Sequence, residues 1–113
     1  MLLIEDDRAG AEVLTRLLGK LEHAAKAVEN VEEAARTLAA ETFDLVLLDN
    51  VLPGPTGMQS LSRLRGLTKA PVWIMSGYTD DDTRQDALLL GAAGFLPKPI
   101  EISALSAVIE RLP

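Results

Sequence analysis

Five short apolar runs divide the chain at regular intervals, and each gap between them is long enough for one helix. None of the runs alternates apolar with polar residues, which is typical of strands that helices cover on both faces of a parallel sheet. Strand-like runs that alternate with helical segments predict a βα repeat with right-handed crossovers. The predicted strands are Leu2–Ile4, Ala24–Val28, Leu45–Leu48, Val72–Met75 and Ala93–Leu96.

The segments between these runs carry the apolar spacing of amphipathic helices. Leucines at positions 14, 17, 18 and 21 fall on one helix face, and similar stripes recur over residues 31–38 and 105–112. Asn30 and Glu33 are spaced as a capping box, and Gly91 follows "ALLL" where a helix end favours a left-handed residue. Shorter helices are predicted over Met58–Arg65, ending at Gly66, and over Asp80–Leu90.

This pattern predicts an α/β fold, namely a doubly wound, flavodoxin-like sheet of five parallel strands with helices on both faces. The strand order 2-1-3-4-5 is expected for this count of strands. The length of 113 residues fits one domain that spans residues 1–113. In such sheets the functional crevice lies beyond the carboxyl ends of the strands, where the winding direction reverses.

Composition excludes several classes of function. The formal net charge of -6 argues against direct nucleic-acid binding, which needs a basic face. The chain has no cysteine, so neither disulfides nor thiolate metal sites are available. No apolar run approaches the roughly 18 residues of a membrane span, and no signal peptide is recognisable. We therefore expect a soluble, cytoplasmic domain without a membrane partner.

Polar residues follow four of the five predicted strands. Asp49 comes directly after Leu45–Leu48, and an unpaired carboxylate is costly to bury, so it must meet water, cations or hydrogen-bond donors. Other strands are followed by the acids at positions 5–7, by Ser76 and by Lys98. Carboxylates that converge at one edge repel one another unless a hard cation such as Mg²⁺ lies between them. With Lys98 and Ser76 opposite, the cluster could hold a phosphoryl group.

The whole chain resembles the response-regulator receiver domains of two-component signalling. The resemblance rests on "LLIEDD", "LVLLDNVLPGPTG", "PVWIMSGYTD" and "GFLPKPI", four motifs that occur in the family's order and spacing. It implies that Asp49 is the phosphoacceptor and that Ser76 and Lys98 bind the phosphoryl group. It further implies a Mg²⁺ site made by Glu5, Asp6, Asp49 and the backbone carbonyl of Val51, and a cis peptide bond before Pro99.

The resemblance also implies a mechanism and partners. A histidine kinase or phosphotransfer protein, or a small phosphodonor, is expected to transfer its phosphoryl group to Asp49 with Mg²⁺. Ser76 then moves inward and the ring of Phe95 fills the vacated space, which changes the surface of the fourth helix, fifth strand and fifth helix. That surface is where a partner, an output domain or a second copy is expected to bind. We expect a signalling domain, with slow loss of phosphate, and not an enzyme.

Departures from the family pattern leave two alternatives open. Asn50 follows the acceptor where an apolar residue is usual, and neither Val51 nor Tyr78 offers an acid or amide to guide water, hence the expected slow hydrolysis. One alternative is a degenerate receiver that binds partners without phosphorylation. The other is a haloacid-dehalogenase-like phosphatase, although Val51 stands where such enzymes carry a second Asp. "HAAK" at His23 is similar to the HxxK of helical phosphotransfer bundles, but the five strands disfavour that fold.

Overall fold

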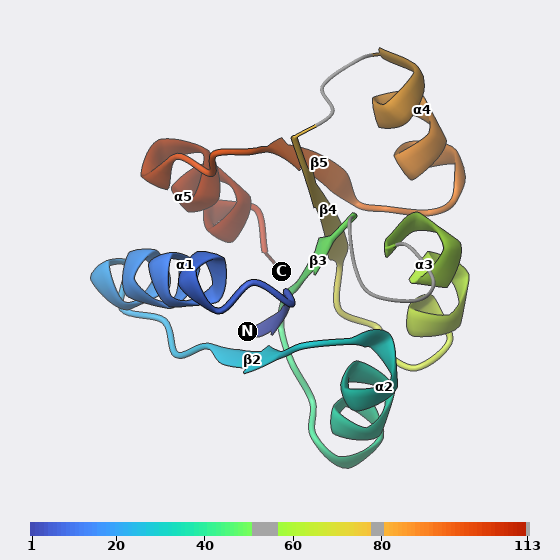
Figure 1. The fold of residues 1–113 in the computed structure, drawn as a ribbon, viewed down its shortest axis with the longest axis horizontal. Helices are drawn as coiled ribbons and strands as arrows, with labels where there is room; N and C mark the ends of the chain where they lie inside the picture. The colour runs from blue at the N-terminus through green and yellow to red at the C-terminus, as the bar shows by residue number, and fades with distance from the viewer. Residues whose placement is uncertain (51–56, 78–80, 113) are drawn as a thin grey trace.

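The computed structural model describes residues 1–50, 57–77 and 81–112, which form the predicted α/β fold (Figure 1). Five strands pair in parallel in the order β2-β1-β3-β4-β5. The strands are β1 (Leu2–Ile4), β2 (Lys26–Val28), β3 (Val46–Asp49), β4 (Val72–Ser76) and β5 (Gly94–Pro97). The helices are α1 (Arg8–Lys20), α2 (Val31–Ala40), α3 (Gly57–Arg65), α4 (Asp81–Leu89) and α5 (Ile102–Glu110).

Helices cover both faces of the sheet, with α1 and α5 on one face and α2, α3 and α4 on the other (Figure 1). Successive strand residues point to opposite faces, so a buried strand needs apolar side chains at every position. In β1, Leu3 packs into the α1/α5 core, whereas Leu2 and Ile4 pack into the other core. The absence of polar alternation in the sequence is therefore a consequence of two cores that share one sheet.

Strands β3, β4 and β5 each end one residue later than predicted, and the ends of the first two matter for the site. Each of β3 and β4 extends one residue beyond its apolar run, so Asp49 and Ser76 are the last residues of their strands. At the other end of the sheet, β2 begins at Lys26 and not at Ala24. Its register explains this difference, because Lys26 pairs with Leu2, where β1 begins.

The helix caps agree with the sequence signals. The Asn30 side chain accepts a hydrogen bond from the Glu33 amide at 2.9 Å and begins α2, while Glu33 itself accepts from the amide of Glu29. Gly91 has a φ of 101°, the left-handed conformation expected after α4. Asp7 caps α1 by accepting from the Ala9 amide at 3.2 Å.

Within the described ranges, no helix is long and apolar enough to cross a bilayer.

Candidate functional site

Three side chains from distant parts of the sequence meet at the carboxyl edge of the sheet. Glu5 follows β1, Asp49 ends β3 and Lys98 follows β5. The Lys98 ammonium donates hydrogen bonds to Glu5 Oε1 at 3.1 Å and to Asp49 Oδ1 at 2.9 Å. Both carboxylate side chains are only 4% exposed, whereas the lysine side chain is 32% exposed. Lys98 therefore contacts two buried acids while part of its side chain reaches solvent.

The charges in this cluster change one another's proton affinity. Burial, and then the neighbouring Asp49 carboxylate, raise the pKa of Glu5 from 4.5 to about 7, although Lys98 partly opposes the change. Burial by itself acts to lower the pKa of Lys98, but the hydrogen bonds and negative charges of Asp49 and Glu5 outweigh it and raise that pKa. The lysine is thus charged near neutral pH, and the site holds more carboxylate charge than one ammonium balances.

The donor atoms fit a hard divalent cation. Carboxylate oxygens of Glu5, Asp6 and Asp49 all lie within 4.8 Å of one another, with Asp6 on the exposed side. Among the described side chains, Glu5 Oε2 is a buried oxygen without a hydrogen-bond partner, as expected for an atom that needs a further positive ligand. Mg²⁺ and Ca²⁺ both prefer such oxygen ligands. Val51, expected to add a backbone carbonyl, lies outside the described residues.

Ser76 and Phe95 come from the two strands beside Asp49. Ser76 is buried at the end of β4, and its backbone carbonyl accepts a hydrogen bond from the Lys98 amide at 2.8 Å. Phe95 lies on β5, is half-buried and packs against the core on the α2/α3/α4 face. The guanidinium carbon of Arg84 on α4 lies 5.5 Å from the centre of the Phe95 ring. The peptide bond between Lys98 and Pro99, expected to be cis, is cis.

Gly10, which was not among the residues predicted from the sequence, belongs to the site through the space that it leaves. A Cβ atom at this position would lie 3.1 Å from Glu5 Oε1 and 3.3 Å from Asp7 Oδ2. Any side chain there would press on a buried acid of the cluster. The signal was present, because glycine inside a helix costs stability and usually has a packing reason.

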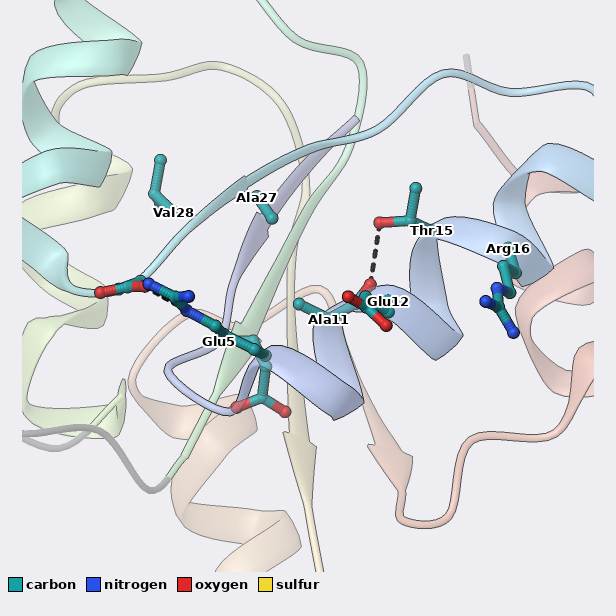
Figure 2. A pocket seen from close by; sticks show the side chains of 9 residues that line it. Glu5, Ala11, Glu12, Thr15, Arg16, Ala27 and Val28 are labelled. Atoms are coloured by element: carbon teal, nitrogen blue, oxygen red, sulfur yellow. Dashed lines mark hydrogen bonds and ion pairs between the residues drawn. The ribbon is translucent and has the colours of Figure 1, made fainter.

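Two hollows flank α1 next to the acidic cluster, and Glu5 lines both. One, of about 400 Å³, also borders Lys98 and Gly10 and reaches the loop after β5. The other, of about 380 Å³, lies between α1 and β2 (Figure 2). Arg8 forms an exposed ion pair with Glu29 at 3.5 Å beside this second hollow. The first hollow thus opens directly beside the Lys98 ammonium and Glu5.

The remaining sequence candidates lie in less informative places. The backbone N–H of Asn50 donates a hydrogen bond to the Met75 carbonyl at 2.9 Å. The polar residue after Asp49 thus continues the pairing of β3 with β4. Tyr78 lies outside the described residues. His23 lies in the connection between α1 and β2 of an α/β fold, which confirms that the chain is not a helical phosphotransfer bundle.

Comparison with known proteins gives one consistent result. The family model described as "Response regulator receiver domain" matches residues 1–110. The chain is 41% identical to the response regulator protein FleR of Pseudomonas aeruginosa, over 98% of this chain and 24% of FleR. It is 30% identical to the two-component response regulator ORR42 of rice, over 97% of this chain and 83% of ORR42. The chain spans about a quarter of the length of FleR and of several other relatives.

A solved structure adds a chemical detail about a relative. A response regulator protein from Burkholderia pseudomallei aligns with a TM-score of 0.86 and 28% identity, covering 94% of this chain and 63% of that one. Its crystal structure contains a phosphorylated aspartic acid, a calcium ion and citrate. In that relative, an aspartate is phosphorylated in a structure that also holds a hard divalent cation.

Proposed function

The chain belongs to the response regulator receiver domain family, and from this premise we propose that residues 1–113 form a receiver domain that is phosphorylated on Asp49. The observation that carries the proposal is the double contact of Lys98 with two buried acids, at 3.1 Å to Glu5 and 2.9 Å to Asp49. A purely structural acid would not need a second carboxylate beside it, because like charges at short range are unfavourable.

In the proposed reaction, an Asp49 oxygen attacks phosphorus in line with the leaving group. The new P–O bond forms as the P–N bond of a phosphohistidine, or the P–O bond of a small acyl phosphate, breaks. Lys98 neutralises charge on the phosphoryl oxygens, and the Ser76 hydroxyl donates a hydrogen bond to one of them. The leaving imidazole or carboxylate keeps the electron pair of the broken bond.

Glu5, Asp6 and Asp49 would hold Mg²⁺, together with the Val51 carbonyl, which lies outside the described residues. When bound, the ion supplies positive charge to the phosphoryl oxygens and fixes their orientation. Glu5 and Asp6 themselves orient no substrate atom; their role is to place two of the ion's oxygen ligands. Gly10 keeps the space beside Glu5 free for that purpose.

The proposed partners follow from this chemistry. The donor is a histidine kinase or phosphotransfer protein, and the domain acts in a cytoplasmic phosphorelay without direct contact to nucleic acid or membrane. Phosphorylation draws Ser76 inward, Phe95 follows, and the surface of α4, β5 and α5 changes for a partner, an output domain or a second copy. Phe95 has no hydroxyl, so packing and its contact with Arg84 must carry this change.

Incubation with acetyl phosphate and Mg²⁺, followed by intact-mass measurement, tests the proposal. We expect the parent to gain one phosphoryl group and the Asp49→Asn variant to gain none. Asp86→Asn is the matched control, because Asp86 is an exposed acid on α4 that is not among the carboxylates gathered at the site. Lack of phosphate on the parent, with acetyl phosphate and with a phosphohistidine donor, would favour the alternative of a degenerate receiver. Continuous release of phosphate from simple phosphate esters would favour the phosphatase.

A further inference from the structure

The edge of the sheet opposite the acidic site carries a hollowed surface around the loop that joins α3 to β4. Two cavities of about 560 and 270 Å³ flank this loop, and both are lined by residues 68–70. The larger cavity also reaches Val72, the first residue of β4, whose last residue Ser76 belongs to the acidic site. Five strand residues span about 13 Å, so the two surfaces lie at opposite ends of the sheet.

We call the surface formed by Arg65, Leu67, Lys69 and Leu88 the basal surface. Among the described residues, six large apolar side chains are exposed, and four of them lie at this end of the molecule. Leu67 lines the smaller cavity and is 40% exposed, while Leu88 lines the larger one and is 51% exposed. The remaining two of these four are Leu89, the last residue of α4, and Leu90, which follows it. Exposed apolar side chains that gather beside a hollow are typical of interaction sites.

The charge of the basal surface differs in sign from that of the whole chain. Arg65 and Lys69 line the larger cavity, and none of the described residues that line it is acidic. The smaller cavity contains Glu41, but Lys26 pairs with that carboxylate at 2.5 Å. A local cationic surface on a chain of net charge -6 attracts acidic partners and repels basic ones, whereas the remaining surface does the reverse.

One of the two cations is already held in position. Arg65 donates a hydrogen bond to the carbonyl of Gly91, just after α4 ends. That bond uses one of the five N–H donors of a guanidinium and fixes its place against the cavity. Within the described part of the chain, no hydrogen bond or ion pair engages Lys69. The Arg65 side chain is therefore already ordered before an acidic group binds, which lowers the entropic cost of binding.

We infer that the basal surface is a docking site for an acidic amphipathic helix of a partner protein. An apolar side chain of that helix packs against the exposed Leu88 at the rim of the larger cavity, and carboxylates one turn away contact Lys69 and Arg65. Spacing of three or four residues places an apolar and an acidic side chain on neighbouring parts of one helix face, as this surface requires. The site does not involve Asp49, so the inference does not depend on the proposed phosphorylation.

Binding can be followed by ¹H–¹⁵N correlation spectra of the unphosphorylated protein in EDTA. The probe is a synthetic helical peptide with leucines one turn apart flanked by glutamates, and its matched control carries lysine in place of each glutamate. We expect the acidic peptide to shift the amide signals of residues 65–70 and 88–93, and the basic peptide to leave them unchanged. Lys69→Glu and Leu88→Ser should each weaken binding by about tenfold or more.

Two matched variants, Lys20→Glu and Val13→Ser, alter an exposed cation and an exposed apolar residue on α1 and should bind like the parent. Equal shifts with the basic peptide, or shifts confined to other residues, would overturn the inference. The same holds if the signals of the basal surface move with protein concentration alone, because a second copy would then be the occupant. If a leucine-free polyglutamate peptide bound equally well, the surface would bind anions in general, and the inferred amphipathic helix would be wrong. Every substituted side chain is exposed, so we expect each variant to fold. Unchanged amide signals away from the basal surface check this.

Discussion

Replacement of Lys98 by methionine should destabilise the protein in a manner that depends on pH. The ammonium lies 3.1 Å from Glu5 Oε1 and 2.9 Å from Asp49 Oδ1, and both acids are buried. Breaking a buried ion pair costs roughly 3–5 kcal/mol, but this lysine is one-third exposed and solvent screens part of the interaction. We therefore expect the free energy of unfolding to fall by about 2 kcal/mol at pH 8.

The pH dependence follows from the raised pKa of Glu5. Below pH 4.5 the carboxyl is protonated in both folded and unfolded chains; between 4.5 and about 7 only the unfolded chain loses the proton. The folded state then binds more protons, so this group's contribution to stability is lost as the pH rises through 7. Without the opposing charge of Lys98, the pKa of Glu5 should rise further. The loss caused by Lys98→Met should therefore be smaller at pH 5 than at pH 8.

Urea unfolding in EDTA at pH 5 and pH 8 measures both effects. Lys69→Met is the matched control, because it removes an exposed lysine away from the acidic cluster and should change stability little at either pH. Mg²⁺ at ten times its dissociation constant for the parent should raise the parent's free energy of unfolding by about 1.4 kcal/mol. The same Mg²⁺ concentration should raise that of Lys98→Met by at least as much. The reasoning would be refuted if Lys98→Met lost the same free energy at both pH values, or lost no more than Lys69→Met.

Three smaller perturbations test other parts of the structure. In Gly94→Ala, the new Cβ would lie 2.4 Å from the ring of Trp73, so thermal unfolding should show a loss of about 1–3 kcal/mol from overpacking, which Trp73→Leu should partly relieve. Asn30→Ala removes the cap that accepts from the Glu33 amide, and urea unfolding should show a loss of about 1 kcal/mol, whereas Asn30→Asp should lose less. Tyr78→Glu places an acid where the family resemblance suggests that water approaches, so the phosphorylated form should lose phosphate faster by intact mass; an unchanged rate would contradict that role.

The parts of the fold that depend on local pattern could be predicted from the sequence. Each strand buried on both faces needs an uninterrupted apolar run, and the rules of handedness and connection leave few arrangements for five such runs. The acids were predictable for a related reason, because Glu5 follows one buried strand and Asp49 ends another, and the carboxyl ends of these strands share one edge of the sheet.

What could not be predicted depends on contacts between distant segments. The start of β2 at Lys26 is set by the position at which β1 begins to pair with it, which its own residues do not encode. The role of Gly10 depends on how closely the Glu5 carboxylate approaches α1. Leu88 is part of "ALLL", an apolar run whose three leucines the packing of α4 nevertheless leaves exposed.

The contacts of Lys98 also link the stability of the fold to its proposed chemistry. The lysine offsets the charge of two buried carboxylates, and its ammonium already lies within hydrogen-bond distance of Asp49. A phosphoryl group on Asp49 would bring up to about two negative charges to that point. Lys98 would then need little movement to contact the new oxygens, and a charge positioned in advance requires little reorganisation during transfer. Because one contact serves both purposes, substitutions of Lys98 should alter unfolding and phosphorylation together.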